Sequence, residues 1–139
     1  MHRLIYRSQS LRPIDWALVH EILEVSERNN AAHGLSGILL ATEREFLQVL
    51  EGESLAVAET YQRISQDTRH RDLHVIADHV VPDRLFGQWA MHDIGIFDFN
   101  ASLSFQLAAQ YGDGKGGIRF PDSEAGVLAM IQDIRVARD

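Results

Sequence analysis

The sequence predicts one α+β domain in which a β-sheet carries two helices on one face. Five segments of strand length are apolar or alternate between apolar and polar residues, and two longer segments repeat apolar residues at helical spacing. They follow one another in the order β-α-β-β-α-β-β, which is close to the ferredoxin-like arrangement of an antiparallel or mixed sheet. The 139 residues, 45% of them hydrophobic, suffice for one compact domain with its own core.

The first half of the chain is predicted to hold a strand, a helix and a hairpin. Residues 2–8 alternate as a strand does. Pro13 suits the first turn of a helix, and apolar residues then recur at helical spacing until NNAAHG (29–34) ends it. Residues 34–42 and 45–52 are apolar runs separated by a short polar stretch, which predicts a hairpin.

The next segment completes the predicted sheet. Ser54 is expected to cap a second helix, which DTRHR (67–71) ends. Residues 73–81 and 86–97 are predicted to form two more strands. We therefore assign residues 1–97 to the domain itself.

Residues 98–139 are predicted to form a helical extension of that domain. A short helix is expected around residues 103–111. GDGKGG (112–117) spells a dinucleotide fingerprint, but such a fingerprint must follow a strand and open a helix, and here residues 118–121 (IRFP) come next, which favours a linker.

A final amphipathic helix is expected over residues 122–137. Asp122 or Ser123 can cap it. Its apolar stripe must be covered, and the sheet face opposite the two other helices is the natural dock. The stripe consists of Val127, Leu128, Ile131 and Ile134.

Composition excludes several classes of function. The net charge of −7 lacks the excess of Lys and Arg that nucleic-acid binding needs. There is no signal-peptide pattern and no uninterrupted run of about 18 apolar residues, so a cytoplasmic protein without a membrane span is expected. The absence of cysteine excludes disulfides, thiolate metal sites and any reaction through a cysteinyl adduct.

Gln48 stands out within the apolar strand 45–52. It shares a strand face with Phe46 and Leu50, and both faces of the strand are apolar, which predicts a central, covered strand. A buried amide left without partners costs roughly 1–3 kcal/mol. Neighbouring groups could satisfy the amide of a lone glutamine, so a functional interpretation needs other residues.

Five motifs supply such residues. They are, in order, IYRS (5–8), ILEVSERNNAAHGLSGILL (22–40), FLQVLEG (46–52), RISQDTRH (63–70) and RLFGQWAM (84–91). In their order and spacing they resemble the BLUF family of blue-light sensors that use FAD, over residues 3–97. Leu35 and Thr42 depart from the residues usual in the family, at positions without a photochemical role.

The resemblance implies that Tyr6 and Gln48 carry the photochemistry. Photoexcited flavin is a strong one-electron oxidant, and a phenol is among the few side chains it can oxidise. The oxidised Tyr6 would pass its proton to the Gln48 amide, which would exchange donor for acceptor towards the flavin by turning over or tautomerising. The dark and lit states would then differ in hydrogen bonds and not in a covalent bond.

The resemblance also implies a non-covalent FAD site around the first helix. The Asn30 amide suits the C4=O and N3–H edge of the flavin, and Asn29 is a weaker candidate. Arg69 is the preferred partner of the diphosphate. Further candidates for contact with the cofactor are Ile22, Ser26, Arg28 and Arg63.

Trp89 and Met91 share one face of the last predicted strand. Ordinary core packing would explain both. The resemblance implies a signalling role, since the family's residues at these positions are described as exchanging places near the glutamine.

Metal and carboxylate chemistry are not expected. His70 and His74 have the spacing of helical ligands, but the helix is predicted to end between residues 67 and 71, and His70 belongs to a family motif as a structural residue. Glu51 and Glu53 are interpreted as solvated turn residues, since no nucleophile–base pair accompanies them.

The predicted function is therefore that of a photoreceptor that is not an enzyme. Residues 98–139 are too few for an appended cyclase or phosphodiesterase, so the output is expected to reach a separate effector protein or a second copy of the chain. A cyclic-dinucleotide phosphodiesterase or regulator is one possible effector. Two alternatives remain open. One is a small acylphosphatase-like enzyme, although SQSLRP (8–13) offers Arg12 without a glycine loop, and the other is a dimeric module without photochemistry that binds another small ligand.

Overall fold

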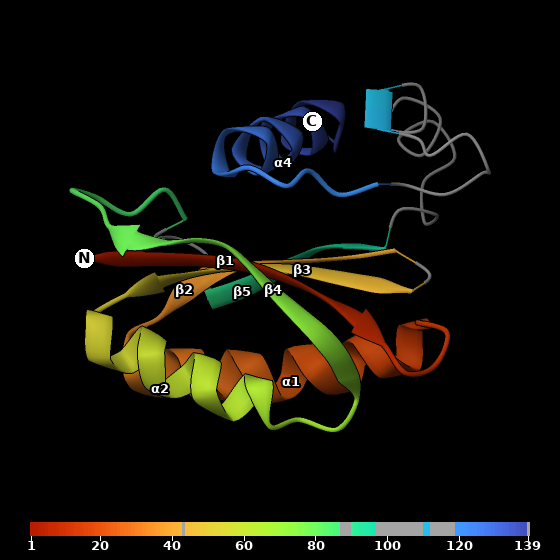
Figure 1. The fold of residues 1–139 in the computed structure, drawn as a ribbon, viewed down its shortest axis with the longest axis horizontal. Helices are drawn as coiled ribbons and strands as arrows, with labels where there is room; N and C mark the ends of the chain where they lie inside the picture. Colours follow the sequence, from red (N-terminus) through yellow and green to blue (C-terminus); the bar gives the residue numbers. More distant parts are fainter. Residues whose placement is uncertain (43, 87–89, 97–109, 112–118, 139) are drawn as a thin grey trace.

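The computed structural model describes residues 1–42, 44–86, 90–96, 110–111 and 119–138. The ribbon shows three layers, with a β-sheet between helices on both faces (Figure 1). The elements are β1 (His2–Ser10), α1 (Trp16–His33), β2 (Ser36–Ala41), β3 (Glu45–Gly52), α2 (Ser54–Ser65), β4 (His70–Val80), β5 (Ala90–Ile96) and α4 (Glu124–Arg138).

The strands lie in the order β4-β1-β3-β2-β5. The pairs β4–β1, β1–β3 and β3–β2 are antiparallel, and β5 adds to β2 in parallel. Helices α1 and α2 cover one face, and α4 lies over the other (Figure 1). The predicted ferredoxin-like α+β fold is confirmed, with β5 as an additional edge strand. The central position of β1 and β3 places the photochemical candidates in the middle of the sheet.

Local capping corrects two predicted helix starts. Helix α1 begins after Asp15, whose carboxylate accepts from the N–H of Leu18 at 2.8 Å, so Pro13 lies ahead of the helix and not in its first turn. Helix α2 begins after Glu53, so Ser54 is the first helical residue and not the cap. At the other end of α1, Gly34 adopts φ 66°, a left-handed conformation that favours glycine.

Two hydrophobic clusters lie on the two faces of the sheet. On the side of α1 and α2, alternate residues of the central strands, such as Leu4 and Leu50, pack with Leu18. On the other side Ile5 and Val49 belong to the cluster that includes α4. Strand alternation explains why neighbouring residues enter different clusters.

Helix α4 docks on the sheet face that the sequence indicated. The Ser123 hydroxyl accepts from the Gly126 N–H at 3.1 Å, which caps the helix as expected. Met130, which the predicted stripe omitted, is fully buried, whereas Leu128 is only partly buried. The fully or nearly fully buried residues of the helix are Val127, Met130, Ile131 and Ile134.

Several expectations concern residues outside the described part of the chain. The linker 112–117 and most of the short helix expected around 103–111 lie there, although residues 110 and 111 are helical. Within the described residues, no helix has the length and apolar character that crossing a membrane requires.

Candidate functional site

A cavity of about 290 Å³ lies on the side of the sheet that α1 and α2 cover. Of the predicted photochemical and cofactor-binding residues, Arg28 does not line it, whereas the following do: Tyr6, Ile22, Ser26, Asn29, Asn30, Gln48 and Arg69. Helix α1, strands β1 to β3, helix α2 and the turn before β4 all contribute to the wall. The further lining residues are Val25, Leu39, Phe46, Thr60, Arg63, Ile64, Gln66, Asp67 and His70.

Tyr6 and Gln48 meet inside this cavity. They are direct cross-strand partners in the antiparallel β1–β3 pair, and both side chains are buried. The Tyr6 hydroxyl donates a hydrogen bond to Gln48 Oε1. The prediction that Gln48 lies in a central, covered strand is confirmed, and the phenol supplies one of its partners.

The surroundings of Tyr6 keep its phenol protonated. The ring packs edge-on against Tyr61 and His70, at centroid distances of 5.5 Å and 6.4 Å. Burial raises the pKa of Tyr6 well above its ordinary value of 10.0, and Tyr61 and Asp67 raise it further. Tyr6 is therefore a hydrogen-bond donor throughout the neutral pH range.

This shift predicts how the protein behaves in alkali. Since folding raises the pKa of Tyr6, the unfolded chain releases the phenolic proton above pH 10.0 while the folded chain holds it. The stability that this group contributes is complete below pH 10.0 and is lost as the pH rises above it. We expect the tyrosinate absorbance of Tyr6 to appear only when the fold is lost, measured as the difference between the wild type and Tyr6→Phe in a titration followed by circular dichroism. A tyrosinate signal near pH 10.0 from an intact fold would contradict the prediction.

Asn30 offers an unsatisfied donor to the cavity. Asn30 is 1% exposed, and its Oδ1 accepts from Asn29 Nδ2 at 3.5 Å. Within the described part of the chain, Asn30 Nδ2 has no hydrogen-bond partner. A buried donor left unpaired costs roughly 1–3 kcal/mol. A ligand with a carbonyl oxygen at this point would remove that cost.

The three arginines predicted to contact the cofactor differ in their position relative to the cavity. Arg69 and Arg63 line the cavity, but Arg28 is not among the lining residues and its Nε donates to the Glu24 carbonyl at 3.4 Å. Arg69 already pairs with Asp67, with Nη2 2.5 Å from Oδ2, and with Glu21 at 3.2 Å. The hydrogen bonds from Arg69 lower the pKa of Asp67, despite partial burial. An anion at Arg69 would have to share the guanidinium with these carboxylates.

His70 uses both ring nitrogens within the protein. Nε2 donates to the Ile64 carbonyl at 2.7 Å, so Nδ1 accepts from the Ser8 hydroxyl, also at 2.7 Å. These two bonds hold the start of β4 against β1 and the end of α2. Among the described residues, no three His, Cys, Asp or Glu side chains are grouped as a metal site would need.

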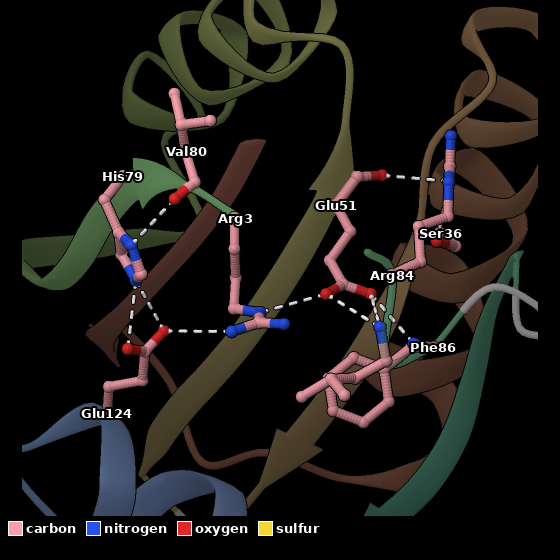
Figure 2. Close-up of polar contacts among 9 residues, drawn as sticks. Arg3, Ser36, Glu51, His79, Val80, Arg84, Phe86 and Glu124 are labelled. Carbon is pink, nitrogen blue, oxygen red and sulfur yellow. Dashed lines mark hydrogen bonds and ion pairs between the residues drawn. The ribbon is translucent and has the colours of Figure 1, made fainter. Parts of the chain in front are cut away.

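The interpretation of Glu51 as a solvated turn residue is wrong. Its side chain is fully buried on the sheet face opposite the cavity, where it accepts hydrogen bonds from Arg3 and from backbone N–H groups (Figure 2). One signal was present in the sequence. Arg3 shares a face of the first strand with the apolar Ile5, and an arginine buried on such a face needs a buried anion as its partner.

Comparison with known proteins gives the class. Residues 1–92 match the model of the family "BLUF: Sensors of blue-light using FAD", and the chain belongs to this family. It is 34% identical over 89 residues to the photoactivated adenylate cyclase subunit beta of Euglena gracilis, a match that covers 63% of this chain and 10% of that protein. It is 33% identical over 88 residues to the blue light- and temperature-regulated antirepressor BluF of Escherichia coli (strain K12), covering 63% of this chain and 22% of that protein. The dark-state structure of BlrB, a BLUF protein, matches with a TM-score of 0.75 at 25% identity, over 99% of this chain and 96% of that chain.

The cavity residues fit the flavin that this family uses. A flavin edge alternates carbonyl acceptors with a ring N–H donor, and the amides of Asn29, Asn30 and Gln48 provide both kinds of partner. Asn30 Nδ2 is a buried donor for which the described residues offer no acceptor. The apolar side chains of Leu39 and Phe46 suit the faces of a flat aromatic ring.

The two predicted signalling residues cannot be placed beside this site. Trp89 lies outside the described residues. The backbone of Met91 belongs to β5, next to β2, but its side chain is not among those described. Their role stays a prediction.

Proposed function

We propose that this chain is a blue-light photoreceptor that binds FAD non-covalently in the cavity and is not itself an enzyme. The observation that carries the proposal is the buried hydrogen bond from Tyr6 to Gln48 on the wall of that cavity. It joins an oxidisable phenol to an amide whose two ends have opposite hydrogen-bonding character. The membership of the family supports the choice of ligand.

Residues of α1 and the sheet would hold the flavin ring. Asn30 would donate Nδ2–H to a carbonyl oxygen, with Asn29 and Gln48 as further amide partners. Ile22 and Ser26 would contact the cofactor from the same helix. Arg69, together with Arg63, would meet the diphosphate.

The chemistry of the response follows from the paired side chains. A bound flavin that has absorbed blue light supplies a one-electron oxidant. Tyr6 gives up an electron, and its phenol then becomes a strong acid. Because the hydroxyl already donates to Gln48 Oε1, the proton has a direct route to that oxygen. The electron and a proton would then return to Tyr6, so that the flavin is oxidised again and Gln48 is left turned over or tautomerised. Gln48 would present a changed set of donors and acceptors to the cavity, and this difference would define the lit state.

The signal would leave the domain through protein contacts. The names of the relatives place this kind of sensor with a cyclase subunit in one protein and with an antirepressor in another, so one module serves different outputs. For this chain we propose a separate effector protein, a second copy of the chain, or both. Met91 would take part because it belongs to β5, and Trp89 because it directly precedes the first residue of β5 in the sequence.

An absorption spectrum before and after blue light tests the function. We expect the purified protein to be yellow, with an oxidised flavin band that moves to the red under blue light and returns in the dark. Chromatography of the released cofactor should identify FAD and separate it from FMN. A flavin band that light does not shift would contradict the photoreceptor proposal, and a colourless protein that hydrolyses acyl phosphates would favour the acylphosphatase-like alternative.

A further inference from the structure

We propose that Glu51 is a positioning residue that couples the Tyr6–Gln48 pair to α4 and to the connection between β4 and β5. The proposal rests on the proposed function and adds the route by which a change at Gln48 reaches the opposite face of the sheet. Glu51 lies on β3, three positions after Gln48 and on the other face.

The Glu51 carboxylate lies at the centre of a buried polar cluster. It accepts from Arg3 Nε at 2.9 Å, and the side chains of both residues are almost completely buried. The backbone N–H groups of Leu85 and Phe86 donate to Glu51 at 3.0 Å and 2.8 Å (Figure 2). A carboxylate with this many charge-assisted partners has one preferred position, because moving it would leave a buried charge or N–H unpaired.

One arm of the cluster holds the connection between β4 and β5. Besides the two N–H groups of Leu85 and Phe86, Arg84 binds this end of the sheet. It donates to the Glu51 carbonyl at 3.2 Å, to the Ser36 hydroxyl at 2.8 Å and to the Gly34 carbonyl at 2.6 Å. Residues 84–86 are therefore fixed to β2 and β3 immediately before the segment in which the sequence carries Trp89.

The other arm reaches the start of α4. Arg3 donates from Nη1 to Glu124, the first residue of α4, at 3.3 Å. His79 on β4 donates from Nε2 to the two oxygens of Glu124 at 2.9 and 2.8 Å (Figure 2). Arg3 therefore shares its guanidinium between β3 and α4.

The register of β1 and β3 connects this cluster with the photochemical pair. Tyr6 is paired with Gln48, and Arg3 with Glu51, in the same antiparallel ladder. The first pair meets in the cavity and the second on the α4 face. A change in the Tyr6–Gln48 hydrogen bond that alters the alignment of these two strands must therefore act on the Arg3–Glu51 pair, and through it on both arms.

Glu51→Gln tests the coupling, with Glu53→Gln as the matched control. Glu53 is exposed, lies two residues away and makes no capping hydrogen bond. Each full-length, flavin-loaded variant would be measured by absorption and by hydrogen exchange of the α4 amides, in the dark and under blue light. The amide can still accept from Leu85 and Phe86, but Arg3 loses its buried counter-charge.

We expect the wild type and Glu53→Gln to show a light-dependent change in α4 exchange. In Glu51→Gln the red shift should remain, α4 should exchange about tenfold faster or more in the dark, and the light-dependent difference should disappear. If Glu51→Gln does not fold, Glu124→Gln serves instead, because the Glu124 side chain is 29% exposed and its replacement leaves the Arg3–Glu51 pair intact. That variant should keep the red shift and show a smaller light-dependent difference in α4.

Two results would overturn the coupling role. One is a wild type that shifts to the red without any light-dependent change in α4. The other is a light-dependent change that Glu51→Gln, or Glu124→Gln where it is used instead, retains at the level of Glu53→Gln. A wild type without a red shift would instead refute the photoreceptor function. In that case the dark exchange rate of α4 would still show whether Glu51 holds the helix.

Discussion

Tyr6→Phe is expected to keep FAD bound and to abolish the red-shifted state completely. The phenyl ring retains the edge-on contacts with Tyr61 and His70, so the cavity wall keeps its shape. The hydroxyl that donates to Gln48 Oε1 is lost, and with it the only proton that the oxidised ring could pass on. The measurement is the light-minus-dark absorption spectrum of the purified, flavin-loaded variant, with the cofactor content determined after release.

Tyr61→Phe provides the control for this experiment. Tyr61 is partly buried, and its ring contacts that of Tyr6, but it lies outside the Tyr6–Gln48 hydrogen bond. We expect this variant to keep the red shift. A Tyr6→Phe variant that shifts and recovers like the wild type would show that the proton takes another route.

The alternation of residues along each strand predicts the strand faces to which Tyr6 and Gln48 belong. Tyr6 and Gln48 were each assigned to a strand, and the pattern of β3 showed that its amide would be covered. That the two residues face each other is a matter of strand order and register, which local patterns leave undetermined. The family resemblance supplied this information, and the β1–β3 ladder agrees with it.

Glu51 shows why the local sequence is insufficient to predict whether a charged side chain is buried. An isolated glutamate at a strand end is usually solvated, and local sequence offers no reason to think otherwise. Its burial depends on Arg3 and on the N–H groups of Leu85 and Phe86, which the fold brings from more than 30 residues away along the chain in either direction. Burial of a charge is decided by partners that are remote in sequence.

Arg69 illustrates a related limit. Its motif predicted a place at the flavin site, and it does line the cavity. The sequence did not indicate that Asp67, two residues earlier, would bind the guanidinium through Nε and Nη2. The availability of a cation to a ligand depends on side-chain partners as well as on position.

The second large effect is expected from Leu128→Ser combined with Ile131→Ser in α4. Ile131 is 2% exposed within the cluster that joins the helix to the sheet, and Leu128 packs at its edge. Truncating a buried aliphatic side chain typically costs about 2–5 kcal/mol, and a hydroxyl without a partner adds to that cost. We expect α4 to leave the sheet, which hydrogen exchange of its amides would show. The red shift should remain, because Tyr6 and Gln48 lie on the opposite face.

Ala129→Ser with Gln132→Ser is the matched control, because both residues are exposed on the same helix. Release of α4 uncovers Ile5, Leu47 and Val49. The variant with Leu128→Ser and Ile131→Ser will therefore tend to associate through this exposed sheet face, whether or not it is illuminated. The informative quantity is therefore the difference in oligomeric state or effector binding between light and dark, and not association itself. An intact red shift with no such difference identifies α4 as the element that carries the signal. A difference that persists at the level of the control would make α4 a passive cover, and the signal would then have to leave through another surface.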